Sequence, residues 1–202
     1  MAIYAPEELH AEVEARAGEL GSVAFVAEGR NKRLREMWCA SRFGMGYEKH
    51  FEPCTIEIDA ADEQREFDFH LIAAGDRMPF QIAEVLESYR RRGDEYRGRT
   101  QEQINAILNG RPSHSAAYAA ERVCAVLSKK AKHYAASDSL HVLLYLNLNV
   151  SVIPWATLAS SVEPHTGDFA SVWVESQYLF CCLYGGERWR GATGWKPIET
   201  SS

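Results

Sequence analysis

The chain has 202 residues, of which 46% are hydrophobic and 25% charged, close to the average for soluble globular proteins. This composition excludes a disordered chain, because there is enough apolar side chain to offset the entropy lost on ordering. The formal net charge of −6 has the wrong sign for a protein whose whole surface binds nucleic acid.

The length favours one domain with elaborations. We expect residues 1–30 to form an N-terminal helical extension, residues 31–150 the core, and residues 151–202 a C-terminal elaboration of the same domain. The most apolar stretch, residues 142–159, is broken by two asparagines and a proline, so it does not predict a membrane span.

The five cysteines are odd in number, contain no C-x-x-C motif, and include the adjacent pair Cys181 and Cys182. This pattern argues against a disulfide framework and against a zinc site. The first ten residues are polar and acidic and do not resemble a signal peptide. We therefore expect buried free thiols in a reducing cytoplasm.

The chain begins with two predicted helices. The first spans Pro6 to Leu20, because Pro6 lies near its start, two glutamates occupy its first turn, and Gly21 follows it. The second runs from about residue 31 to residue 43, and we expect Gly44 and Gly46 to end it.

The hydrophobic period then changes from 3.6 to 2. Residues 54–59, 66–72 and 79–86 alternate between apolar and polar side chains, which predicts an antiparallel meander of three strands. A long helix over about residues 115–136 and a strand over residues 141–149 follow, then a helix near Trp155 and a strand over residues 178–184. This order predicts an α/β fold with a mixed central sheet flanked by helices.

Three side chains in these elements are unusual for their positions. Asp68 lies between two phenylalanines in a predicted strand, where aspartate is disfavoured. Gln81 would line the same side of the sheet, and Glu84 would join them only if a bulge turned it. Lys130 lies in the apolar stripe of the long helix, so it either meets a carboxylate on the facing sheet or extends past its neighbours to solvent.

The order of these features resembles that of the PD-(D/E)XK nuclease superfamily, which has the restriction-endonuclease-like fold. The resemblance covers about residues 31–149. It depends on four weak motifs in a fixed order: Glu36-Met37-Trp38, Asp68, Val85-Leu86 followed by Arg90-Arg91-Arg92, and the helix end from Lys129 to Tyr134.

The resemblance implies a role for each of these positions. Asp68 would match the metal-binding aspartate, Gln81 the glutamate of the E-x-K pair, and Glu36 the helix glutamate beside the metal. Ala83 stands where the family has its lysine, so Lys130 would supply the missing ammonium. The implied catalytic set is therefore Glu36, Asp68, Gln81 and Lys130, with Mg²⁺ held by Asp68 and Glu36.

Two functions follow from the resemblance as expectations. The first is Mg²⁺-dependent phosphodiester hydrolysis on DNA, with the metal activating water and the lysine stabilising charge on the phosphate. The second is a catalytically inactive nuclease-like protein that binds nucleic acid or a protein partner, because Gln81 and Ala83 weaken the site.

A basic segment offers a place for such a partner. Residues 89–134 contain ten lysines and arginines against four acids. We expect Arg90, Arg91, Arg92, Lys129 and Lys132 to contact phosphates if nucleic acid binds. The alternative is that these side chains form an ordinary solvated helix surface.

Overall fold

The structure is a computed structural model that describes residues 2–58, 67–90, 96, 98–133, 137–151 and 153–198. The described residues form one sheet of eight strands, which lie side by side in chain order. Their bounds are β1 Ala2–Tyr4, β2 Cys54–Ile58, β3 Phe69–Ala73, β4 Asp76–Val85, β5 Ser137–Leu146, β6 Phe169–Glu175, β7 Leu179–Tyr184 and β8 Lys196–Pro197.

The sheet is mixed. The pairs from β1 to β4 are antiparallel, β5 is parallel to both β4 and β6, and the pairs from β6 to β8 are antiparallel. A parallel pair needs a crossover connection, which here contains the helices between β4 and β5. The predicted α/β class, with a mixed sheet flanked by helices, is confirmed; the finer restriction-endonuclease-like arrangement is not.

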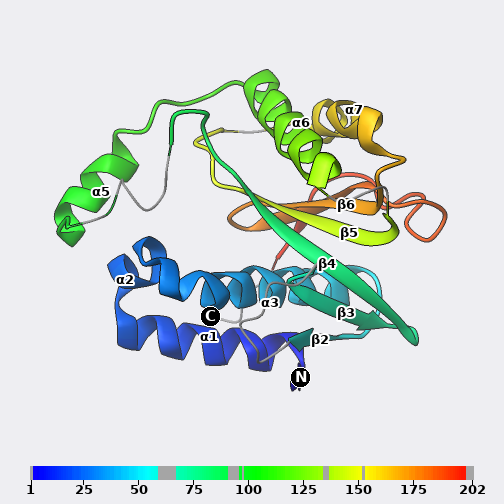
Figure 1. The fold of residues 1–202 in the computed structure, drawn as a ribbon, viewed down its shortest axis with the longest axis horizontal. Helices are drawn as coiled ribbons and strands as arrows, with labels where there is room; N and C mark the ends of the chain where they lie inside the picture. Colours follow the sequence, from blue (N-terminus) through cyan, green and yellow to red (C-terminus); the bar gives the residue numbers. More distant parts are fainter. Residues whose placement is uncertain are drawn as a thin grey trace.

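Helices cover both faces of this sheet (Figure 1). On one side lie α1 (Pro6–Leu20) and α3 (Lys32–His50), joined by α2 (Ser22–Ala27) and the short 3₁₀ turn η1 (Gly29–Asn31). On the other lie α6 (Ala116–His133) and α7 (Trp155–Val162), the latter followed by the 3₁₀ turn η2 (Glu163–His165). The helix α5 (Gln101–Asn109) lies away from the sheet, opposite α2 (Figure 1).

Each face has its own hydrophobic core. Phe43 and Tyr47 of α3 pack with Phe69, Phe80 and Trp173 of the strands. The opposite core joins α6 and α7 to alternate residues of β4, β5 and β6. Ordinary strand alternation therefore gives β4 one face toward α3 and one toward α6.

The predicted helix over residues 6–20 and the predicted meander are confirmed, although the strand predicted over residues 66–72 begins at Phe69. The predicted end of the second helix is wrong, because α3 continues through both glycines to His50. A β-carbon at Gly46 would lie 2.7 Å from the Phe180 ring, so this glycine allows close helix–sheet packing inside the helix. Tertiary contact thus outweighs the low helix propensity of glycine.

The described helices include none that is both long and apolar enough to cross a membrane. The five cysteines are free thiols, and four of them are buried.

Gly46→Ala is expected to lower the free energy of unfolding by about 1–3 kcal/mol, because the added methyl group must displace the Phe180 ring. The matched control is Gly18→Ala in α1, where a β-carbon meets nothing within 4 Å. That substitution is expected to stabilise the protein by about 0.5–1 kcal/mol, as it does in an open helix position. Urea unfolding of both variants measures the difference, and equal effects would contradict the packing assignment.

A buried ion pair connects α3 to the sheet. The Arg42 Nε donates to the Glu175 Oε1 at 2.7 Å, and the Arg42 guanidinium lies 4.3 Å from the centre of the Trp38 ring. Glu175 is completely buried, and its other carboxylate oxygen has no hydrogen-bond partner among the described residues. Burial raises the pKa of Glu175 to about 7, although the neighbouring Arg42 charge opposes the shift.

Glu175 is therefore expected to make unfolding pH-dependent. Between its usual pKa of 4.5 and the folded value of about 7, the folded state keeps a proton that the unfolded state has lost. The contribution of Glu175 to the free energy of unfolding is largest below pH 4.5. It falls as the pH rises to about 7, by on the order of 1 kcal/mol per pH unit. Urea unfolding across this pH range should show that the free energy of unfolding declines in the wild type and changes less in Glu175→Gln. Equal pH dependence in the two proteins would refute the assignment to Glu175.

Candidate functional site

The candidate site lies where β3 and β4 differ in length. The pairing of β3 with β4 begins at Phe69 opposite Phe80, whereas β4 continues to Val85 along β5. Beyond this point the edge of β4 that faces β3 is not covered by a strand of the described residues. Side chains from α3 and α6 approach the sheet here, one from each face.

Asp68 directly precedes the first residue of β3 and extends the hydrogen bonding along β4. Its backbone N–H donates to the Phe80 carbonyl at 2.7 Å, and its Oδ2 accepts the Ile82 N–H at 2.6 Å. The carboxylate thus replaces the backbone carbonyl that a longer β3 would have offered to Ile82. Burial, and then the negative charge of Glu36, raise the pKa of Asp68, while the Ile82 N–H and Lys130 oppose the shift.

Lys130 extends from α6 to the same place. Its Nζ donates to the Gln81 Oε1 and lies 3.3 Å from the Ile82 carbonyl oxygen. Burial lowers the pKa of the Lys130 ammonium, and the Asp68 carboxylate is the largest influence that opposes this shift. The structure therefore places Lys130 toward the sheet and not toward solvent, although these two hydrogen bonds go to an amide and a backbone carbonyl, whereas the sequence predicted a carboxylate partner. Lys129 is exposed.

Glu36 approaches from α3 with two basic neighbours. Its carboxylate lies 3.0 Å from the Lys32 Nζ and 3.3 Å from the Arg33 Nη1, and it is only 13% exposed. The same Arg33 nitrogen donates to the Asp68 carbonyl at 2.7 Å, which ties α3 to the start of β3. We call Glu36, Asp68, Gln81 and Lys130, together with Lys32 and Arg33, the acid–base cluster.

The four residues that the sequence proposed for chemistry thus meet in space, but Lys32 and Arg33 were not foreseen. Their positions four and three residues before Glu36 were the signal available in the sequence, since residues with that spacing lie next to each other on a helix surface. Glu84 does not join the cluster through a bulge: its carboxylate accepts from the Asn147 side chain at 2.7 Å, and β4 keeps a regular register with β5 there.

The cluster is a poor fit to a protein-held Mg²⁺. Mg²⁺ needs near-octahedral oxygen ligands. Here the Gln81 oxygen accepts from Lys130, and Glu36 is paired with Lys32 and Arg33. The described part of the chain contains no group of three or more histidine, cysteine or acidic side chains placed to hold a metal. Mg²⁺ binding by Asp68 and Glu36 therefore stays a prediction from the sequence, and we derive no chemical step from it.

The five side chains predicted to contact phosphates do not form one exposed surface among the described residues. Arg90 is buried and donates to Glu87 at 2.7 Å and to the Asn147 carbonyl at 3.0 Å, so its guanidinium serves an internal network and not a phosphate contact. Arg91 and Arg92 lie outside the described residues, whereas Lys129 and Lys132 are exposed. DNA as a partner stays a prediction that the structure does not test.

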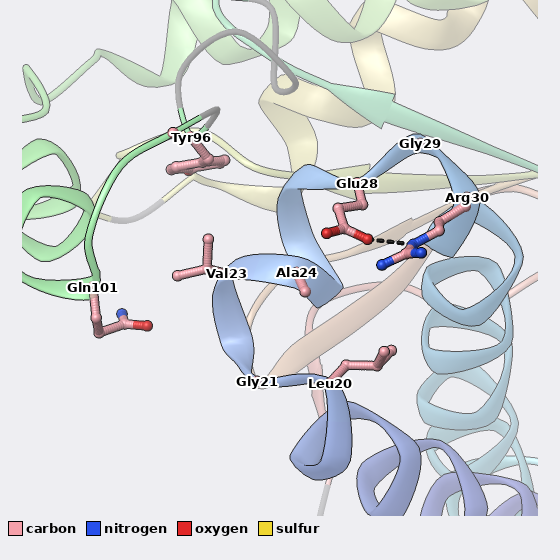
Figure 2. A pocket seen from close by; sticks show the side chains of 10 residues that line it. Leu20, Gly21, Val23, Ala24, Glu28, Gly29, Arg30, Tyr96 and Gln101 are labelled. Atoms are coloured by element: carbon pink, nitrogen blue, oxygen red, sulfur yellow. Dashed lines mark hydrogen bonds and ion pairs between the residues drawn. The ribbon is translucent and has the colours of Figure 1, made fainter.

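A cavity of about 870 Å³ lies beside the start of α3 (Figure 2). Val23 and Ala24 of α2 form one wall, and Tyr96 and Gln101 face them from the other side. Its Gly29 and Arg30 lead directly into the first turn of α3, although Arg30 is paired with Glu28. No residue of the acid–base cluster lines this cavity, so the cluster and the cavity are separate features.

No protein-family model matches the chain, and no curated protein matches it. Among solved structures, it is similar to a protein of unknown function from Pseudomonas aeruginosa strain PAO1, which is described as a member of the monooxygenase superfamily. The two share 18% identity, the match covers 96% of this chain and 93% of the other, and the TM-score is 0.50.

This likeness overturns the resemblance to the PD-(D/E)XK nucleases, which is wrong. The matching fold is that of a protein assigned to a different superfamily. The predicted Mg²⁺-dependent cleavage of DNA is wrong with it, as is the alternative of an inactive nuclease-like protein. The motifs misled because each is short and weak, and an acid–amide–lysine set at a strand end is not specific to one superfamily.

Lys130→Met is expected to raise the pKa of Asp68, because the substitution removes a positive charge that favours the carboxylate. Lys129→Met, one position along the same helix with an exposed side chain, is expected to leave it nearly unchanged. Carbon-13 NMR titration of the aspartate carboxyl groups measures both values. A shift of the same size in both variants would show that Lys130 has no special relation to Asp68.

Proposed function

We propose that the chain is an enzyme that uses the acid–base cluster to remove a proton from a small organic anion. Asp68 is the base, Lys130 stabilises the negative charge that develops on the substrate, and Lys32 attracts the substrate's anionic group. The observation that carries the proposal is that Asp68 and Lys130 both bind Ile82, the first through its N–H and the second through its carbonyl, where no strand of the described residues covers this edge of β4.

The environment of Asp68 suits a general base. Proton abstraction is most effective when the base has a pKa close to the working pH, and burial together with Glu36 shifts the pKa of Asp68 in that direction. Only its Oδ2 accepts the Ile82 N–H, so the hydrogen bond fixes the carboxylate while using one of its two oxygens. A fixed carboxylate keeps its orientation during the reaction.

Lys130 acts electrostatically. Its ammonium is held between the Gln81 side chain and the Ile82 carbonyl, in a site where burial strengthens its action on nearby charge. An enolate or similar anion that forms beside Asp68 would be stabilised by this fixed cation without reorganisation of the site. Gln81 positions Lys130 for this purpose.

The exposed positive charge of Lys32 at the edge of the cluster favours an anionic substrate. The Lys32 side chain is 75% exposed while its Nζ contacts Glu36, so it can turn to a ligand without leaving the site. The likeness to a monooxygenase-superfamily protein concerns the fold. It suggests oxygenation as one further reaction to test, because oxygenation of an organic substrate can follow removal of its proton.

Hydrogen–deuterium exchange tests the proposal whatever product the enzyme forms. A panel of 2-oxo acids and 1,3-dicarbonyl carboxylates is incubated with the protein in D₂O, and proton NMR follows loss of the acidic C–H signal. Exchange is expected for at least one acid. Asp68→Asn and Lys130→Met should each reduce it by about 10²-fold or more, whereas Lys129→Met should retain it.

Two further measurements examine whether a metal takes part in the exchange and whether oxygenation follows it. The proposed proton transfer uses only side chains of the acid–base cluster, so a chelator should leave exchange unchanged. Loss of exchange on chelation would contradict this proposal. Oxygen uptake measured in parallel shows whether proton removal leads to oxygenation. Absence of exchange with every acid, or exchange that survives Asp68→Asn, would contradict the proposed function.

A further inference from the structure

A second cluster of reactive side chains lies on the other side of α6. Cys124 and Ser128 are one helical turn apart, and Ser128 is about 160° around the helix from Lys130, so they face away from the acid–base cluster. His165 of η2 lies against them, with its Nε2 3.8 Å from the Cys124 Sγ and 3.0 Å from the Ser128 Oγ. Asp168 completes the group through the His165 Nδ1, at 2.8 Å.

The aspartate determines which nitrogen of the imidazole carries the proton. An ionised carboxylate only accepts hydrogen bonds, so the Nδ1 of neutral His165 carries the hydrogen that it donates to Asp168. The Nε2 then presents a lone pair toward Cys124 and Ser128. The turn itself is fixed by the hydrogen bond from the Asp168 N–H to the His165 carbonyl, at 3.1 Å, so the pair keeps its geometry.

Ser128 and Cys124, the two possible nucleophiles, require different surroundings in order to react. A serine alkoxide that attacks a carbonyl needs N–H donors for the oxyanion, and the N–H groups around Ser128 are already used inside α6. A thiolate is nucleophilic without such help and reacts with soft electrophiles and peroxides. Cys124 is also the one partly exposed thiol of the five, whereas Cys39, Cys54, Cys181 and Cys182 are buried.

We propose that Cys124 is a redox modification site, at which His165, oriented by Asp168, activates the thiol for oxidation by hydrogen peroxide. The proton of the thiol moves to the His165 Nε2, and the thiolate sulfur attacks one peroxide oxygen. A sulfur–oxygen bond forms as the oxygen–oxygen bond breaks, and the departing hydroxide takes the proton from His165 to give water. The sulfur is oxidised to a sulfenic acid, and the peroxide is reduced.

Sulfenic acid trapping tests this site on the intact protein. The native chain is treated with hydrogen peroxide in the presence of dimedone, and peptide mass spectrometry locates and times the label. Cys124 is expected to be labelled, with the four buried cysteines unlabelled. His165→Gln and Asp168→Asn are each expected to slow labelling of Cys124 about tenfold or more, the second because asparagine can donate to Nδ1 and so move the hydrogen to Nε2.

Ser128→Ala is the matched control, since it removes a neighbour of the same imidazole nitrogen and keeps the base; labelling should persist in it. The buried cysteines report on folding, because a variant that unfolds would label them too. Labelling of Cys124 no faster than that of the buried cysteines would overturn the proposal. An unchanged rate in folded His165→Gln, or an equal loss in Ser128→Ala, would also overturn it.

Discussion

The strand β4 is the element on which the rest of the molecule depends, because it pairs antiparallel with β3 on one edge and parallel with β5 on the other. The antiparallel edge needs only the tight turn at Gly75, whereas the parallel edge needs a long crossover that contains α6. The crossover places α6 over the face of β4 opposite α3. Because β4 continues past the start of β3, the two helices approach a stretch of β4 whose β3-facing edge pairs with no strand among the described residues.

The acid–base cluster is a consequence of that arrangement. A carboxylate, rather than a strand, satisfies the Ile82 N–H, and an ammonium from α6 satisfies the Gln81 side chain and the Ile82 carbonyl. Burial acts on the two ionised groups in opposite directions, raising the pKa of Asp68 and lowering that of Lys130. Each charge partly offsets the cost of burying the other, which is why the pair can persist beside a hydrophobic core.

Periodicity was sufficient to predict the first helix and the meander, because each depends on local spacing. It placed Lys130 in the apolar stripe of its helix but left open whether the side chain meets the sheet or solvent. It was insufficient where distant contacts decide. The continuation of α3 past Gly46 depends on Phe180, more than 130 residues later in the chain. The strand β6 was missed because it is buried on both faces and shows no alternation. The family was misjudged because residue types at a strand end report local chemistry, whereas superfamily membership concerns the whole arrangement of elements.

The central claim is that Asp68 and Lys130 act on each other across the open edge of β4. A double-mutant cycle of Asp68→Asn and Lys130→Met, measured by urea unfolding at neutral pH, tests it most directly. Coupled residues give an interaction energy of about 0.5–3 kcal/mol, and we expect a value in that range. Two substitutions whose effects simply add, within about 0.3–0.5 kcal/mol, would mean that the residues are neighbours without interacting, and would contradict the account.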